Sequence, residues 1–213
     1  MSKKTLFLTC SFLLILSVLG CVGNGETTTD GSINYLTDFE PVHADGDINV
    51  VIEIPAGTLE KWEVSKPSGN MALNQVDGKP RIIQYLGYPG NYGMIPQTLL
   101  PKALGGDGDP LDVLVLGAPV ERGTIVKAKV IGVLQLLDGG EQDDKLIAVQ
   151  QNSPLYRVDT LEQLQAEYKG IAEIIETWFS NYKGAGKLAS KGFYNRDKAK
   201  EILDKSIEAF AKK

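Results

Sequence analysis

Three carboxylates lie within six residues in the segment Gly105-Gly106-Asp107-Gly108-Asp109-Pro110-Leu111-Asp112-Val113-Leu114-Val115, directly before a run of apolar residues. In extended backbone, residues two apart point to the same side, so Asp107 and Asp109 can share one face. Pro110 then turns the chain and can bring Asp112 back toward them. Carboxylates held this close repel one another unless a cation lies between them. Because the segment offers hard oxygen ligands without sulfur or histidine, it favours Mg²⁺, Mn²⁺ or Ca²⁺ over zinc.

A solvated acidic loop is the alternative interpretation of this segment, because Asp-Gly and Gly-Asp pairs are common turn residues. An EF-hand loop is excluded, because the carboxylates fall at loop positions 1, 3 and 6 and the glutamate position would fall on Ala118. The segment alone leaves the metal site and the acidic loop open.

Composition and charge exclude several classes of function. With 213 residues, 43% hydrophobic and 23% charged, the chain is expected to form one globular domain with extensions. The formal net charge of −5 argues against general binding to nucleic acid or acidic lipid. The single histidine, His43, lies in a polar, loop-like stretch and is expected to be exposed. A Ser-His-Asp hydrolase or a histidine-rich zinc site is therefore disfavoured.

The N-terminal residues have the pattern of a targeting segment. Lys3 and Lys4 precede an apolar run from Leu6 to Leu19 that is too short for a stable membrane-spanning helix. The run ends in Val18-Leu19-Gly20-Cys21, which resembles the lipobox of bacterial-type lipoproteins, although that pattern prefers leucine where Val18 stands. We expect residues 1–20 to be a signal peptide and Cys21 to be lipidated. An ordinary signal peptide and an uncleaved anchor are the alternatives.

A lipidated Cys21 would hold the protein on the exported side of a membrane, in the periplasm or at the cell surface. Removal of residues 1–20 would take away two of the 22 basic residues and none of the 27 acidic ones, so the net charge would become −7. Cys10 would also be lost, and no intrachain disulfide could form. We interpret residues 21–46 as the lipidated cysteine and a flexible tether, and residues 47–213 as the folded domain.

Short β-branched segments dominate the first part of this domain. The sequence predicts strands over residues 49–54, 61–64, 112–116, 124–137 and 146–149. The long segment 124–137 is expected to bend at Gly132. Short and bent strands with turn residues between them predict a small closed β-barrel.

The C-terminal part changes to helical periodicity. Thr160-Leu161-Glu162-Gln163 has the form of a capping box, and apolar residues then recur at helical spacing as far as Tyr182. Trp178 and Phe179 are expected to be core residues. A last helix is predicted from about Asp197 to the end of the chain. The fold class expected from these patterns is mainly β (α+β).

Several polar residues outside the acidic segment are unusual for their surroundings. Glu53 lies inside a predicted strand, where it either faces solvent or enters a polar site. Arg81 could be a surface charge at the start of a strand. Three tyrosines in the segment 85–93 either line a pocket or pack beneath the loop. Carboxylates, cations and phenols together suit a substrate with several negative oxygens that arrives with a divalent metal, as in phosphoryl transfer to water.

These motifs resemble soluble family I inorganic pyrophosphatase. The matching pieces are Val-Val-Ile-Glu-Ile-Pro, Lys-x-Glu, Tyr-Pro-x-Asn-Tyr-Gly and Asp-Gly-Asp-Pro-Leu-Asp-Val, followed by Asp138, Asp143, Lys145 and Tyr182-Lys183. The similarity runs from about Ile48 to the C-terminus. It implies hydrolysis of pyrophosphate to two phosphates, several Mg²⁺ ions per site with Mn²⁺ as an alternative, and homo-oligomeric assembly. It also implies a five-stranded barrel of the oligonucleotide-binding (OB) type with flanking C-terminal helices.

The resemblance implies a role for each matching residue. Asp107, Asp112 and Asp143 would ligate metals, and Asp138 would hold a further ion brought in with the substrate. Asp109 would be the general base toward a water molecule that bridges two metals, with Tyr92 nearby. Cations and phenols would bind the phosphate groups: Lys61, Arg81, Tyr182, Lys183 and Lys187. The supporting residues would be Glu53, Glu63, Tyr88 and Lys145.

Two rival functions belong to other classes. One is a non-catalytic barrel that binds polyphosphate or nucleic acid, and the charge of −7 without a basic and aromatic stripe argues against nucleic acid. The other is a degenerate, lipid-anchored structural relative, which is disfavoured because every metal-binding and general-base aspartate of the family has its match. The sequence departs from the family at Gly139, where an acid is common.

Overall fold

The computed structural model describes residues 33–100, 102 and 105–213. The predicted signal peptide, the predicted lipidation site Cys21 and the first part of the predicted tether lie outside these residues. No helix in the described part of the chain is long and apolar enough to cross a membrane.

Strands dominate residues 33–150, and helices dominate residues 154–213. The strands are β1 (Ile48–Ile54), β2 (Trp62–Val64), β3 (Met71–Leu73), β4 (Gln75–Val76), β5 (Lys79–Pro80), β6 (Asn91–Met94), β7 (Asp112–Leu116), β8 (Ile125–Asp138), β9 (Glu141–Gln142), β10 (Lys145–Gln150) and β11 (Leu188–Tyr194). The helices are the 3₁₀-helix η2 (Pro154–Arg157), α1 (Leu161–Glu167), α2 (Ile171–Asn181) and α3 (Arg196–Ala211).

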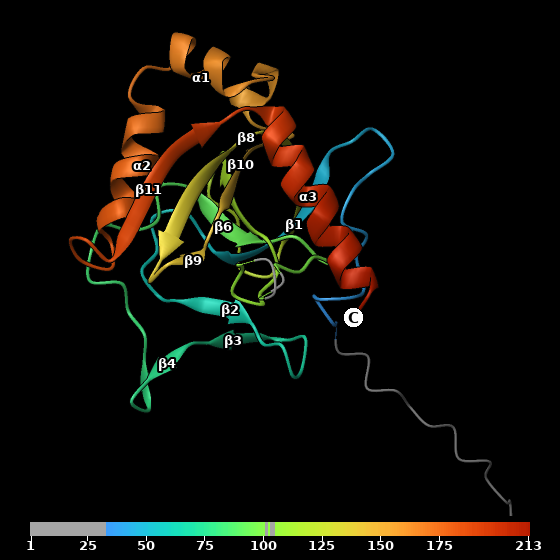
Figure 1. Ribbon diagram of the computed structural model, residues 1–213, viewed down its shortest axis with the longest axis vertical. Helices are drawn as coiled ribbons and strands as arrows, with labels where there is room; N and C mark the ends of the chain where they lie inside the picture. Colours follow the sequence, from blue (N-terminus) through green and yellow to red (C-terminus); the bar gives the residue numbers. More distant parts are fainter. Residues whose placement is uncertain (1–32, 101, 103–104) are drawn as a thin grey trace, which may run out of the picture. The chain divides into compact units, whose positions relative to one another are not determined.

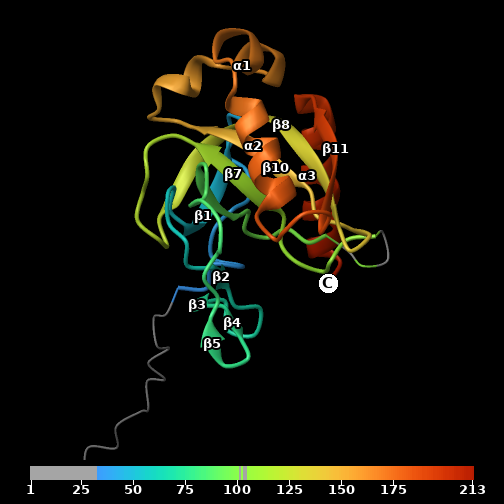
Figure 2. The same ribbon diagram turned by 90° about the vertical axis from the view of Figure 1, so that its left-hand side faces the viewer.

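Five strands form a closed barrel in the order β1-β6-β7-β10-β8, because β8 also pairs with β1. β7 and β10 are parallel, and every other pair in the barrel is antiparallel. β9 and β11 extend the sheet along β8, whereas β2-β3 and β4-β5 are separate two-stranded sheets (Figures 1 and 2). The predicted five-stranded barrel with flanking helices in a mainly β (α+β) chain is therefore confirmed.

The long strand β8 joins the barrel to its extension. Along its 14 residues it pairs with β1, then β10, and finally with β9 and β11. Its register with β10 shifts next to Gly132, the residue where the sequence predicted a bend. A Cβ added to Gly132 would lie 2.0 Å from Cδ1 of Leu161 and 2.7 Å from the carbonyl oxygen of Tyr194. Glycine thus lets α1 and β11 approach the barrel at this point.

Alternating residues of the barrel strands face two hydrophobic cores. Val113 of β7 belongs to the core that includes Ile202 of α3, and Leu114 belongs to the core that includes Trp178 and Phe179 of α2. Figure 1 shows α3 on one side of the barrel and α1 and α2 on another. Each large apolar side chain buried in this way contributes about 1.5–3 kcal/mol. The prediction that Trp178 and Phe179 are core residues is confirmed.

The prediction of one helix from Leu161 to Tyr182 was wrong. Gly170 has φ +91°, a left-handed conformation that breaks the helical hydrogen-bond ladder between α1 and α2. The predicted start is confirmed, because Oγ1 of Thr160 accepts a hydrogen bond from the amide of Gln163 at 3.1 Å. The sequence also missed β11, whose residues mix small, charged and aromatic side chains without clear alternation.

The packed part of the chain begins before residue 47, where the sequence placed the domain boundary. Tyr35 and Leu36 pack against the small core formed by Val51, Val64 and Met94. The amide of Tyr35 also donates to the carbonyl of Gly69 at 2.8 Å. Val42 packs against the larger core, and Nε2 of Gln97 donates to the carbonyls of Thr37 and Phe39, so this stretch is joined to the barrel at several points.

Candidate active site

One cavity of about 580 Å³ brings together 13 of the 15 side chains predicted to form the site. They are Glu53, Lys61, Glu63, Arg81, Tyr92, Asp107, Asp109, Asp112, Asp138, Asp143, Lys145, Tyr182 and Lys183. Tyr88 and Lys187 do not line it. The residues come from barrel strands, from the β2-β3 hairpin, from the acidic segment before β7 and from the end of α2.

The barrel topology brings the two acidic segments together. Because β7 and β10 run parallel with Asp112 opposite Lys145, the loops that precede both strands meet at the same end of the barrel. Asp107 and Asp109 lie in the first loop, and Asp143 lies in the second. Because β7 and β10 are parallel here, two acidic segments that are separate in the sequence contribute to one site.

Local hydrogen bonds hold the first acidic loop in place. The Oδ1 atom of Asp107 accepts a hydrogen bond from the amide of Asp109 at 2.8 Å, across Gly108 with φ +83°. The amide of Leu111 donates to Oγ1 of the buried Thr98 at 2.9 Å. Glycine and aspartate turn chemistry thus sets the carboxylate spacing, as the sequence indicated.

The Oδ1 atom of Asp109 is shielded from solvent and takes part in an ion pair. The charged group beside it is the ammonium of Lys66, whose side chain is half exposed. Sequence reasoning missed Lys66, and its place in the same hairpin as Lys61 and Glu63 was the signal that could have indicated it. Because both side chains of this pair are about half exposed, the Asp109 carboxylate can exchange Lys66 for a proton or a ligand.

Lys145 lies between two carboxylates at the floor of the cavity. Its Nζ donates a hydrogen bond to Oδ2 of Asp112 and another to Oδ1 of Asp143, the latter at 2.6 Å. Burial alone would raise the pKa of Asp112, but the ammonium groups of Lys145 and Lys61 outweigh it and lower that pKa. Burial likewise would lower the pKa of Lys145, and the two carboxylates raise it instead. Asp112 and Lys145 therefore both stay ionised, and Lys145 is held between two carboxylates.

In two other carboxyl groups, a nearby lysine lowers the pKa by less than burial raises it. Burial, reinforced by the charge of Asp112, raises the pKa of Asp107 to about 6. The same two causes raise the pKa of Glu53 to about 7, even though its Oε1 accepts a hydrogen bond from the amide of Val64 at 2.7 Å. Carboxyl groups with raised pKa values in a cavity are typical of sites that take up additional positive charge.

Glu53→Gln is expected to stabilise the metal-free protein at pH 8 and to leave its stability near pH 4.5 almost unchanged. The pKa of Glu53 is 4.5 in the unfolded chain and about 7 in the folded one, so the folded protein binds this proton more tightly. This tighter proton binding stabilises the folded protein fully below pH 4.5, and the stabilisation is lost as pH rises through 7. At about 1.36 kcal/mol per pKa unit, the lost free energy of unfolding is about 3 kcal/mol. Glutamine does not titrate and still offers an oxygen to Val64.

Urea unfolding in the presence of a chelator, at several pH values between 4.5 and 8, measures this difference. Glu121→Gln removes an exposed carboxylate and serves as the control. If wild type and Glu53→Gln lose stability in parallel as pH rises, the raised pKa of Glu53 is contradicted.

Cations and phenols line the same cavity. Nζ of Lys61 is 5.0 Å from the ring centroid of Tyr92, and Lys183 is paired with Asp138. Lys187 lines a neighbouring cavity of about 420 Å³ that shares Arg81 and Lys183 with the first. Oxygen-rich anions fit such a surface, because ammonium, guanidinium and phenol groups all donate hydrogen bonds.

Tyr88 lies behind the cavity and packs there. It is 2% exposed, and its ring centroid is 4.4 Å from that of Trp178 and 5.0 Å from that of Tyr92. Burial raises its pKa, as it does for Tyr92 and Tyr182. Of the two interpretations of the segment 85–93, packing holds for Tyr88, whereas Tyr92 of β6 lines the pocket.

The donor set of the cavity fits hard divalent cations. Its carboxylates offer only oxygen ligands, as Mg²⁺ and Mn²⁺ prefer, and the Lys145 ammonium between Asp112 and Asp143 marks a position where positive charge is favoured. Within residues 33–100, 102 and 105–213, no three acidic, histidine or cysteine side chains converge as a ready metal site. Metal binding would therefore require the carboxylates to turn away from their lysine partners.

Fold and cavity together define a class of barrel enzymes that act on small phosphorylated anions. Residues 50–211 match the family described as inorganic pyrophosphatase. The chain belongs to the inorganic pyrophosphatase family, and the enzyme class predicted from the sequence is confirmed.

Three relatives illustrate the similarity. The mitochondrial inorganic pyrophosphatase of Saccharomyces cerevisiae is 39% identical over 197 residues, which cover 81% of this chain and 62% of that protein. The inorganic pyrophosphatase of Helicobacter pylori (strain ATCC 700392 / 26695) is 33% identical over 183 residues, covering 82% of this chain and 98% of that protein. The solved inorganic pyrophosphatase of Schistosoma japonicum has a TM-score of 0.80 at 27% identity, covering 84% of this chain and 71% of that one.

Proposed function

We propose that the chain hydrolyses pyrophosphate with divalent metal ions held by Asp107, Asp112, Asp138 and Asp143. The observation that carries this proposal is a single cavity that combines these carboxylates with Asp109 and five cationic side chains. When bound, divalent ions such as Mg²⁺ would lower the pKa of a water molecule and offset the charge of the substrate.

Asp109 accepts the proton of the attacking water in this proposal. Its carboxylate lines the cavity and is paired only with the half-exposed Lys66, and its amide donates to Oδ1 of Asp107, so Asp109 is held beside the proposed metal ligands. Tyr92 is buried and keeps its proton, because burial raises the pKa of its phenol. It lies beside Lys61 and can donate a hydrogen bond within the site.

The cationic part of the cavity binds the two phosphate groups. We assign this role to Lys61, Arg81 and Lys183, with the phenol of Tyr182 as an uncharged donor and Lys187 at the edge. Lys145 balances the charge of Asp112 and Asp143, whereas Glu53 and Glu63 act on the metals through bound water. Glu63 is held for this by Asn74, whose Nδ2 donates to it at 2.7 Å.

Release of phosphate from pyrophosphate, measured with the full chain in detergent and with Mg²⁺ or Mn²⁺, tests the proposal. Strong release that stops when the metal is chelated is expected. A gel shift with single-stranded DNA distinguishes the nucleic-acid-binding rival, which the charge of the chain disfavours. Metal uptake without phosphate release would reject the proposed activity.

Homo-oligomeric assembly is proposed as well. Leu86 and Ile174 are 73% and 60% exposed, and they line a shallow apolar cavity with Tyr85 and Trp178. Exposed apolar side chains gathered in this way mark protein–protein contacts. Ile174→Glu is expected to shift the protein to monomers in sedimentation velocity, and an unchanged sedimentation coefficient would argue against this surface.

We also propose that Cys21 is lipidated and that the protein is exported to the periplasmic or cell-surface side of a membrane. The support is the charged start, the apolar run and the Val18-Leu19-Gly20-Cys21 pattern. Fractionation of cells that express Cys21→Ser tests the anchor. If the variant stays in the membrane fraction, lipidation at this position is rejected.

A further inference from the structure

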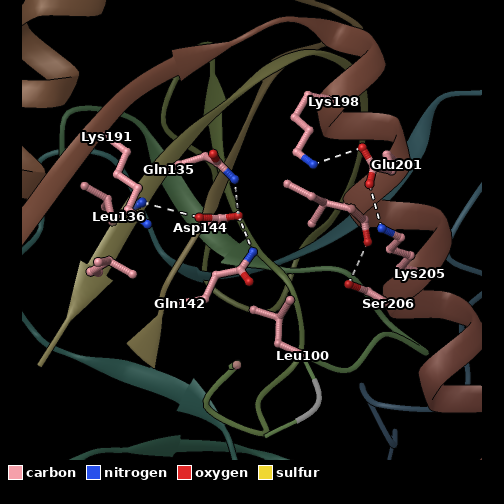
Figure 3. A pocket seen from close by; sticks show the side chains of 13 residues that line it. Leu100, Gln135, Leu136, Gln142, Asp144, Lys191, Lys198, Glu201, Lys205 and Ser206 are labelled. Atoms are coloured by element: carbon pink, nitrogen blue, oxygen red, sulfur yellow. Dashed lines mark hydrogen bonds and ion pairs between the residues drawn. The ribbon is translucent and has the colours of Figure 1, made fainter. Parts of the chain in front are cut away.

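A second cavity of about 420 Å³ lies between the barrel and α3, behind the acidic loops (Figure 3). Gln135, Gln142 and Asp144 line it from the barrel side, and Lys198 and Lys205 line it from α3. Asp144 stands between Asp143 and Lys145 in the sequence but enters this second cavity, whereas its two neighbours enter the active site. The same short segment thus serves two cavities.

Asp144 is buried, with 1% of its surface exposed, and it is the acceptor of a small hydrogen-bond network. Its Oδ2 accepts from Nε2 of Gln142 at 2.6 Å and from Nε2 of Gln135 at 3.1 Å, and its Oδ1 accepts from the amide of Leu136 at 3.4 Å. Figure 3 shows Asp144 at the centre of these contacts. We name Gln135, Gln142 and Asp144 the bracket.

The bracket joins the two loops that carry the proposed metal ligands. The amide of Asp143 donates to the carbonyl of Leu136 at 3.0 Å, next to the contact that Leu136 makes with Asp144. The amide of Gln142 donates to the carbonyl of Gly105 at 2.7 Å, and Gln142 also forms a β-bridge with Gly106. Gln142 therefore links Asp144 to the start of the loop that holds Asp107 and Asp109.

A carboxylate at this position needs an explanation. Among the described residues, no lysine or arginine forms a salt bridge with Asp144, and a buried charge without a cation costs stability. A carboxylate is nevertheless the side chain that accepts from two amide groups and a backbone N–H at once. Asparagine would turn an NH₂ group toward one of these donors and leave it unsatisfied.

We propose that Asp144 is a positioning residue that sets the metal affinity of the active site. Asp144 holds its sequence neighbours Asp143 and Lys145 in place. Through Gln142 it also holds the loop that carries Asp107. This inference rests on the proposed function, because it assumes that these carboxylates bind metal. Loss of groups that orient metal ligands lowers metal affinity by about 10–100-fold.

Asp144→Asn is expected to raise the Mg²⁺ concentration for half-maximal phosphate release by about 10–100-fold, with kcat at saturating Mg²⁺ within a few-fold of wild type. Calorimetric titration of the substrate-free protein with Mn²⁺ should give the same loss of affinity. Gln142→Leu removes one donor of the bracket and should produce a shift in the same direction. Gln142→Leu also tests the proposal if Asp144→Asn does not fold.

Ser206→Ala is the matched control. Ser206 lines the same cavity, and its hydroxyl donates to the carbonyl of Ile202 at 2.8 Å within α3 rather than to the loops. A folded Asp144→Asn or Gln142→Leu with wild-type Mn²⁺ affinity would overturn the proposal. An equal loss in Ser206→Ala would also overturn it, because general loosening would then explain the effect. If wild type binds Mn²⁺ but releases no phosphate, the proposed function fails and the Mn²⁺ titration alone decides the role of Asp144.

Discussion

Asp109→Asn is expected to lower kcat for pyrophosphate hydrolysis by about 10²–10⁴-fold and to leave the folded structure intact, because a positioned general base contributes about this much. Asparagine keeps the shape of the side chain but cannot accept the proton of the attacking water. The side chain of Asp109 is 47% exposed, and its one ion pair is with the half-exposed Lys66, so the substitution removes little packing. Steady-state phosphate release, with thermal unfolding of the same preparation, measures both parts of the expectation.

Asp45→Asn provides the matched control for Asp109→Asn. Asp45 is also a half-exposed aspartate paired with a lysine, Lys127, but it lies outside the cavity. It should show wild-type kcat despite the same change of charge. Near-normal phosphate release by Asp109→Asn would remove Asp109 from the role of base, whereas an equal loss in both variants would indicate a nonspecific effect of charge.

Local patterns were sufficient to predict most of the barrel. The apolar run before Leu116 and the alternation around Val126 correspond to β7 and β8, because β-branched residues with a period of two fit a pleated, half-buried surface. The break at Gly170 was not predictable from periodicity, since Ile171, Ile174 and Ile175 continue the helical spacing across it. A glycine in the left-handed conformation interrupts the helical hydrogen bonds without changing the apolar pattern of the sequence.

The cavity could be predicted only in part from local spacing. Turn chemistry places Asp107 and Asp109 close together, and this much follows from the acidic segment itself. Glu53 and Lys61 are far from Tyr182 in the sequence, and their membership of one site followed from the family resemblance. The family resemblance did not indicate that Asp144 turns away from the active site or that Lys66 contacts Asp109. Both features depend on the packing of separate loops.

The lysine pairs in the cavity explain why carboxylates so close together are tolerated in the folded chain. Lys145 lies between Asp112 and Asp143, Lys183 contacts Asp138, and Lys66 contacts Asp109. Each ammonium group occupies a place where a divalent cation would also be favoured. Lys145 differs from the other two lysines because its side chain is only 3% exposed, so its charge is screened least by solvent.

Lys145→Met is therefore expected to destabilise the metal-free protein by about 3–5 kcal/mol, the usual result of removing one partner from a buried ion pair. Methionine retains much of the apolar stem but leaves Asp112 and Asp143 without a cation. Divalent ions that bind between these carboxylates should restore more stability in the variant than they add to wild type, because they replace the missing charge. Urea unfolding with a chelator and with excess Mg²⁺ measures both effects.

Lys129→Met separates this effect from the general cost of losing a lysine. Lys129 is 12% exposed and pairs with Asp159 away from the cavity, so its loss should cost about 1 kcal/mol and should not depend on Mg²⁺. If Mg²⁺ stabilises Lys145→Met no more than wild type, the carboxylates at Lys145 do not bind the metal. A chelated Lys145→Met as stable as wild type would show instead that Asp112 and Asp143 need no cation, and the charge argument for the whole cavity would fail.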